Sequence, residues 1–248
     1  MCGIVGYIGF RNAYPILIKG LKRLEYRGYD SAGVALVSDE GNMNVYKEKG
    51  KVRNLEALVN GNDCSGQLGI AHTRWATHGE PSSLNAHPHV SQNGRLALVH
   101  NGIIENYSSL RDLLEKEGYV FKSSTDTEIL VQLISFIQDR QNKDLEGAVL
   151  EALHRVVGAY AIAVVDRNAP DKIVVARKSS PLVIGIGEDN KEFFLASDAL
   201  PIIEYTNRMV YLNDNEVALI KVGQDVEIRN FENCGVKAEI TEVDMSLE

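Results

Sequence analysis

The sequence predicts an α+β protein in which buried β-sheets are covered by layers of helices. Of its 248 residues, 44% are hydrophobic, a composition typical of a globular chain that is long enough to bury a large core. The second half of the chain carries many short and nearly continuous apolar runs, as expected for strands covered on both faces. Helical patterns in the middle of the chain supply that cover.

The first quarter of the chain predicts short strands around one helix. The apolar run at residues 4–9 is closed by glycines and predicts a buried strand. Apolar residues then recur at helical spacing from Tyr14 to Leu24, and Pro15 is tolerated in the first helical turn. Further strands are expected at 33–37, 44–47 and 67–71.

The middle of the chain predicts three helices. Asn106 is a candidate N-cap for the first of them, and Gly118 supplies its stop. Thr125 and Glu128 have capping-box spacing ahead of a strongly apolar second helix. A third helix is expected over residues 144–154.

The remainder of the chain predicts short strands followed by a polar tail. The tail, residues 242–248, is expected to be a linker. The expected strands are 159–165, 173–176, 182–186, 193–196, 209–212, 217–220, 226–229 and 236–240.

Composition and charge exclude several classes of function. The net charge of −8 argues against nonspecific binding to nucleic acid, which requires an excess of Lys and Arg. No apolar run approaches the roughly 20 residues that a membrane span needs, and the N-terminus lacks the basic leader of a secretory signal. Cys2, Cys64 and Cys234 form no plausible disulfide framework, which favours a reducing cytoplasm.

The sequence Met1-Cys2-Gly3 places a thiol at the second residue. Initiator methionine is normally removed before a small residue, so the mature chain is expected to begin at Cys2. An α-amine has an unperturbed pKa of about 7.7–8.0 and can accept the proton of a thiol, whose pKa is about 8.5. Cys2 is therefore either a nucleophile with its own base or a small apolar residue that opens a strand.

Residues 71–79 predict a loop at the end of a strand, where ligand contacts concentrate. Arg74 suits a carboxylate, because the guanidinium fork matches two oxygens. Trp75, Thr77 and His78 lie close to it in the sequence. The alternative is a plain loop with Trp75 docked in the core and Arg74 in solvent.

The pair Asn101-Gly102 follows an apolar strand and has two interpretations. Asn-Gly pairs tolerate positive φ and commonly form hairpin turns. The same pair can direct the Asn101 amide and the Gly102 N–H at one point, as an oxyanion hole requires.

Asp126 also has two interpretations. An acid in the first turn of a helix interacts favourably with the helix dipole. It is equally suited to pair with the ammonium group of a substrate.

Five of the six histidines lie between residues 72 and 100, so a metal site has to be considered. His87 and His89 would share one face of a strand. No HExxH, CxxC or recurring carboxylate spacing accompanies them, so no metal is expected.

Several stretches together resemble one enzyme family. Cys2-Gly3-Ile4-Val5-Gly6 resembles the opening of class II glutamine amidotransferases, which are N-terminal-nucleophile hydrolases. The glutaminase half of the glucosamine-6-phosphate synthases is similar in five further stretches: LEYRGYDSAG (24–33), HTRWATHG (72–79), NAHPH (85–89), HNGIIENY (100–107) and TDTE (125–128). The later ASD at 196–198 fits as well. The resemblance implies a four-layer αββα sandwich of two antiparallel sheets, with a glutaminase domain over residues 1–241.

The resemblance also implies a role for each matching residue. Cys2 would be the nucleophile and its α-amine the base, while Asn101 and the Gly102 N–H would form the oxyanion hole. Arg74 would bind the α-carboxylate of glutamine and Asp126 its α-ammonium. The remaining members of the site would be Trp75 beside the substrate, Thr77 and His78 on the covering loop, and Arg27 near the nucleophile.

The implied activity is hydrolysis of L-glutamine to L-glutamate and ammonia without a metal or organic cofactor. In full-length relatives the ammonia converts fructose 6-phosphate to glucosamine 6-phosphate in a C-terminal isomerase half, and this sequence is expected to represent the glutaminase domain without that half. A homodimer is left open. The alternatives are the glutaminase half of an amidophosphoribosyltransferase or asparagine synthetase, a module that binds glutamine without hydrolysing it, and a metallohydrolase.

Overall fold

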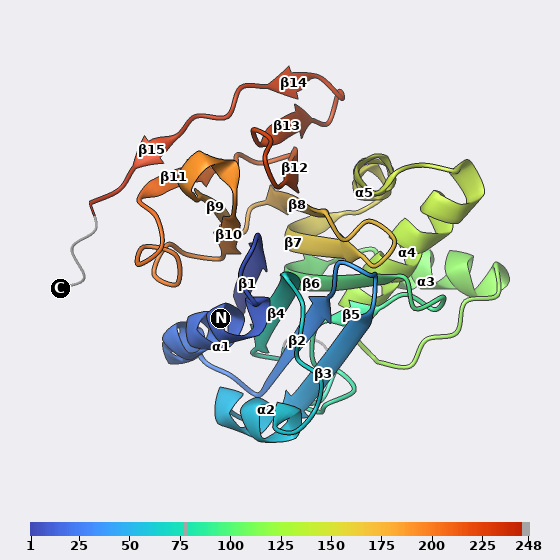
Figure 1. Cartoon of the computed structure of the whole chain (residues 1–248). Helices are drawn as coiled ribbons and strands as arrows, with labels where there is room; N and C mark the ends of the chain where they lie inside the picture. Colours follow the sequence, from blue (N-terminus) through green and yellow to red (C-terminus); the bar gives the residue numbers. More distant parts are fainter. Residues whose placement is uncertain (77–78, 245–248) are drawn as a thin grey trace.

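The computed structural model describes residues 1–76 and 79–244. Two antiparallel β-sheets pack face to face, and helices cover the outer surface of each sheet (Figure 1). The expected α+β architecture with four αββα layers is therefore confirmed.

The first sheet contains eight strands in the order β15-β11-β9-β10-β1-β4-β2-β3. Strand β1 lies near its middle and pairs with β4 on one side and β10 on the other. The strands are β1 (Gly3–Ile8), β2 (Ser31–Val37), β3 (Met43–Lys49), β4 (Leu68–Arg74), β9 (Val183–Ile186), β10 (Phe193–Ala196), β11 (Arg208–Tyr211) and β15 (Thr241–Glu242).

The second sheet contains seven strands in the order β14-β13-β12-β8-β7-β6-β5. Its longest pairing joins β6 to β7. The strands are β5 (His89–Val90), β6 (Leu96–Ile104), β7 (Gly158–Asp166), β8 (Lys172–Lys178), β12 (Glu216–Lys221), β13 (Glu227–Asn230) and β14 (Gly235–Val236).

The helices divide between the two outer surfaces (Figure 1). Helices α1 (Ala13–Leu24) and α2 (Val52–Val59) pack on the first sheet, whereas α3 (Tyr107–Lys116), α4 (Asp126–Gln141) and α5 (Leu145–His154) pack on the second. Two short 3-10 helices, η1 (Glu25–Arg27) and η2 (Glu188–Asn190), complete the set of helices in the described ranges.

The core between the sheets follows from strand periodicity. Successive side chains of a strand point to opposite faces, so every second residue of each strand enters this layer. In β1 these residues include Ile4 and Ile8, and in β4 they include Leu68 and Ile70. Along the whole length of β1, β4 and β6, one face of the strand is therefore directed at the opposite sheet.

Local capping explains where the long helix begins. The Thr125 hydroxyl accepts a hydrogen bond from the backbone N–H of Glu128 at 3.3 Å, as the sequence predicted for the start of α4. Asn106 occupies the predicted N-cap position of α3, but its side chain makes no capping hydrogen bond and instead bonds the Arg155 carbonyl and the Val157 N–H. Asn106 therefore ties the start of α3 to the chain after α5.

Several boundaries differ from the sequence predictions. The strand expected to end at residue 71 continues to Arg74, and the strand expected over 236–240 is limited to Gly235–Val236. Neither α2 nor the two-residue β5 was predicted. Glu242, where the linker was expected to start, still pairs with Arg208 in β15. In the part of the chain that the structure describes, no helix is sufficiently long and apolar to span a membrane.

Candidate active site

A cavity of about 480 Å³ opens where the inter-sheet core ends, and it unites the predicted site residues. Every predicted residue that the structure describes lines it: Cys2, Arg27, Arg74, Trp75, Asn101, Gly102 and Asp126. The predictions for Thr77 and His78 concern positions outside the described residues.

Strand alternation explains why three of these residues converge. Cys2 lies two residues before Ile4, Arg74 lies four residues after Ile70, and Asn101 lies two residues after Val99. Ile4, Ile70 and Val99 all belong to the core between the sheets. An even spacing keeps a side chain on the same face of a strand, so the three polar side chains continue the apolar layer into the cavity.

The Cys2 thiol is held at the end of β4. Its Sγ accepts a hydrogen bond from the Trp75 N–H at 3.1 Å and lies 3.4 Å from the Trp75 carbonyl oxygen. Burial raises the pKa of the Cys2 thiol, while the Trp75 N–H and the charges of the N-terminus and Arg74 act in the opposite direction. A thiol with a raised pKa requires a base before it can act as a nucleophile.

Asn101 and Gly102 lie within a continuous strand. The hairpin-turn interpretation of this pair is wrong, because β6 remains paired with β7 as far as Ile104. Gly102 has φ of +127°, and a Cβ added there would lie 2.1 Å from the Ala159 carbonyl oxygen, so only glycine fits. The Asn101 Nδ2 donates a hydrogen bond to the Cys2 carbonyl at 3.2 Å. This contact and the shared cavity place the Asn101 amide next to the residue that carries the thiol.

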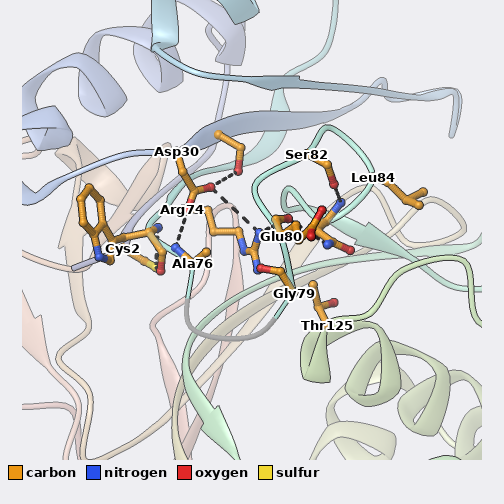
Figure 2. Close-up of polar contacts among 12 residues, drawn as sticks. Cys2, Asp30, Arg74, Ala76, Gly79, Glu80, Ser82, Leu84 and Thr125 are labelled. Carbon is orange, nitrogen blue, oxygen red and sulfur yellow. Dashed lines mark hydrogen bonds and ion pairs between the residues drawn. The ribbon is translucent and has the colours of Figure 1, made fainter.

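The plain-loop interpretation placed Trp75 in the core and Arg74 in solvent, and the structure shows the opposite arrangement. The Arg74 side chain is only 4% exposed, whereas Trp75 is 54% exposed. The Arg74 guanidinium points from β4 toward the following loop and donates to the carbonyls of Gly79 at 3.1 Å and Glu80 at 3.2 Å (Figure 2). Burial of this charge beside the cavity provides a site for an anionic group.

Asp30 fastens the chain immediately after β4. Its carboxylate accepts a hydrogen bond from the Ala76 N–H and lies 4.0 Å from the Arg74 guanidinium (Figure 2). Its backbone N–H donates to the Arg74 carbonyl at 2.6 Å. Asp30 therefore fixes both ends of the segment that carries Arg74 and Trp75.

Asp126 is the first residue of α4, and its side chain is buried. The carboxylate accepts a hydrogen bond from the Ile104 N–H at 2.8 Å and lines the cavity. Asp126 therefore does not act through the helix dipole alone, because its hydrogen bond also joins α4 to the end of β6. A carboxylate has a second oxygen that can also accept a hydrogen bond.

Arg27 approaches the site from η1. Its guanidinium donates to Asp198 at 3.2 Å and to the Ser197 hydroxyl at 3.4 Å. Ser197 in turn accepts a hydrogen bond from the Ile4 N–H at 3.1 Å. The 197–198 segment thus connects Arg27 to β1, the strand that begins directly after Cys2.

Four histidines of the predicted cluster are buried together. His87 stacks on His72 with ring centroids 4.1 Å apart and lies 5.1 Å from His89. His87 precedes β5, so the prediction that it shares a strand face with His89 is wrong. Burial lowers the pKa of His72 to about 3 and holds the pKa values of His87 and His89 well below the usual range. Over the described ranges, no group of three or more His, Cys, Asp or Glu residues is arranged to hold a metal ion.

Sequence reasoning missed two residues that organise this site, His72 and Asp30. His72 lies 2.9 Å from Asn101 across the two sheets, and Asp30 holds Ala76. The signal for His72 was present in the alternation Leu68, Ile70, His72. It was missed because the strand was expected to end at residue 71.

Comparison with known proteins agrees with this geometry. Residues 59–230 match the family described as the glutamine amidotransferase domain. The chain belongs to this family.

Its relatives point to one kind of amidotransferase. The chain is 62% identical over 247 residues to the glutamine–fructose-6-phosphate aminotransferase (isomerizing) of Bacteroides thetaiotaomicron, and 56% identical over 252 residues to that of Chlorobaculum tepidum. Both alignments cover 100% of this chain and 40% of the relative. The chain thus spans less than half the length of these relatives.

Solved structures show the same fold. The glutamine phosphoribosylpyrophosphate amidotransferase of B. subtilis has a TM-score of 0.77 at 28% identity, covering 93% of this chain and 49% of that one. A glutamine aminotransferase class-II domain protein from Silicibacter pomeroyi has a TM-score of 0.61 at 17% identity, covering 93% and 99%. The sandwich is that of the N-terminal-nucleophile amidotransferases, as expected.

Proposed function

We propose that this chain hydrolyses L-glutamine to L-glutamate and ammonia through a glutamyl thioester on Cys2. The observation that carries the proposal is the composition of one cavity. It combines a thiol, an amide donor that bonds the carbonyl of the same cysteine, a buried guanidinium and a buried carboxylate. A zwitterionic amino acid with a side-chain amide complements this set of groups.

Binding would use the two opposite charges of the cavity. Arg74 would hold the α-carboxylate of glutamine, and Asp126 would hold its α-ammonium. This arrangement directs the side-chain amide of glutamine toward Cys2. Trp75 would shield the reacting groups, and the role expected for Thr77 and His78 on the covering loop remains a prediction.

The first half of the reaction forms the thioester. With Met1 removed, the α-amine of Cys2 accepts the thiol proton, and the sulfur attacks the amide carbon. Asn101 Nδ2 and the Gly102 N–H stabilise the resulting oxyanion. The carbon–nitrogen bond then breaks, and the proton held by the amine passes to the leaving nitrogen, which departs as ammonia.

The second half regenerates the enzyme. Water gives a proton to the α-amine and attacks the thioester carbon. The carbon–sulfur bond breaks, glutamate forms, and the sulfur recovers its proton. The raised pKa of the Cys2 thiol supports a mechanism in which a base is part of the site.

The acceptor of the ammonia is proposed from the name of the relatives. Their name specifies fructose 6-phosphate as the acceptor, and we propose that this chain serves the same reaction beside an isomerase half. The higher identity to these relatives, 62% against 28% for the phosphoribosylpyrophosphate enzyme, favours this assignment over another class II amidotransferase. Cytoplasmic location and a homodimer remain predictions. Cys2, Cys64 and Cys234 are all free thiols in the structure.

The proposal is tested by intact mass and covalent labelling of the purified chain. We expect a mass that lacks Met1, release of glutamate from glutamine, and modification of Cys2 by an electrophilic glutamine analogue. Free glutamine should protect against the label, whereas Cys64 and Cys234 should react independently of glutamine. Glutamine binding without hydrolysis or labelling would instead identify a binding module.

Replacing Asp126 with asparagine should weaken substrate binding more than it slows the chemical step. A hydrogen bond to a charged group contributes about 1.5–3 kcal/mol, so KM should rise roughly 10- to 100-fold with kcat nearly unchanged. Steady-state kinetics measure both constants. Asp112→Asn, on the exposed side of α3, is the matched control. An unaltered KM in Asp126→Asn would remove Asp126 from the ammonium site.

A further inference from the structure

The side chain of Asn101 has two orientations of nearly the same shape. Its amide oxygen and nitrogen are similar in size, so packing alone does not choose between them. Only one orientation places N–H donors beside Cys2. The other would turn the amide oxygen toward the developing oxyanion and repel it. Under the proposed function, some group must therefore select the orientation.

Two contacts from opposite sides make this selection. The Cys2 carbonyl accepts from Nδ2 at 3.2 Å, and the His72 Nε2 lies 2.9 Å from Oδ1. The amide nitrogen carries two hydrogens, so one remains for a ligand in the cavity. Because Oδ1 can only accept, this contact requires the tautomer in which His72 carries its proton on Nε2. If the Asn101 amide flipped, Oδ1 would face the Cys2 carbonyl oxygen, and the amide N–H would face the Nε2–H of His72 as long as the ring keeps this tautomer.

His72 is held in the form and position that this contact needs. Its side chain is fully buried, and the low pKa of its imidazole keeps the ring neutral at physiological pH. In the centre of the first sheet, His72 pairs with Ile4 on one side and Gly33 on the other. His87 stacks on its ring with an interplanar angle of 13°. Gly33 permits this packing, since a Cβ at that position would lie 2.0 Å from the His87 carbonyl oxygen.

We propose that His72 is a positioning residue that orients the Asn101 amide for oxyanion binding by donating a hydrogen bond to Oδ1. His72 acts through Asn101 across the two sheets. This inference rests on the proposed glutaminase activity and adds to it a residue that belongs to neither the nucleophile nor the substrate-binding groups.

Two substitutions of His72 test the hydrogen bond. His72→Phe keeps a flat ring against His87 and removes the donor, while His72→Gln retains an N–H group near the position of Nε2. An oxyanion-hole donor contributes about 10²–10³ in kcat, so a misoriented Asn101 in His72→Phe should lower kcat by about 10- to 100-fold with KM within about threefold. His72→Gln should recover most of that loss.

A double-mutant cycle with Asn101→Ala separates positioning from general support of the fold. Once Asn101 is absent, His72→Phe should cause no further loss of kcat, because the two residues act as one unit. Equal losses in both backgrounds, or a wild-type kcat in His72→Phe, would overturn the proposal. Should His72→Phe fail to fold, His72→Asn replaces it, since its shorter amide does not reach Oδ1. Wild-type protein that neither hydrolyses glutamine nor labels at Cys2 would instead refute the glutaminase function itself.

Discussion

Replacing Cys2 with alanine should reduce glutamine hydrolysis by at least about 10³-fold, because removal of a catalytic nucleophile leaves only binding and oxyanion stabilisation. The side chain loses one sulfur atom at the margin of a cavity, so the fold and the binding groups should persist. Glutamate release measures the activity, and titration calorimetry measures the binding of glutamine, which should remain. Alanine is also small enough for Met1 to be removed.

The other two cysteines provide the control. Cys64 is half-buried beside the first sheet, Cys234 is exposed near the second, and both are free thiols. Cys64→Ala and Cys234→Ala should retain wild-type hydrolysis. Appreciable activity in Cys2→Ala, or comparable loss in Cys64→Ala, would contradict the assignment of the nucleophile.

Replacing Asn101 with alanine should lower kcat by about 10²–10³-fold, the usual effect of removing one oxyanion donor. KM should change little, because the amide binds the reacting oxygen more strongly in the transition state than in the ground state. Steady-state kinetics with glutamine separate the two constants. Thermal unfolding checks that β6 remains intact.

Asn101→Asp provides a test that preserves shape. Its carboxylate occupies the same volume but repels an oxyanion, so the loss should equal or exceed that of alanine. An aspartate variant with near wild-type kcat would show that Asn101 contributes bulk alone. The role proposed for the amide would then be lost.

Much of this site could be predicted because its residues occur in short motifs with distinctive chemistry. A thiol at residue 2, an Asn-Gly pair after a strand, and Arg74 after another strand each indicated a function beside a structural alternative. The family resemblance resolved these alternatives in the sequence. The fold class followed from apolar runs and capped helices, which depend on nearby residues alone.

What the sequence did not reveal depends on contacts between distant segments. His72 bonds Asn101 across the two sheets, and Asp30 bonds Ala76 between neighbouring loops. No local pattern indicates which residue will face another after two sheets pack. The hairpin interpretation of Asn101-Gly102 failed for the same reason, since pairing with β7 keeps the strand extended through a glycine at positive φ.

The pairing of β1 on both sides constrains how the beginning of the chain can change. Gly3 lies opposite Thr73, and Val5 lies opposite both Ala71 and Ala196. A deletion or insertion of one residue within β1 would turn the thiol to the face covered by α1, or carry it one step along the strand. The number of residues in this segment is therefore restrained as well as their identity, and the residue count between the thiol and β1 should stay fixed among natural sequences.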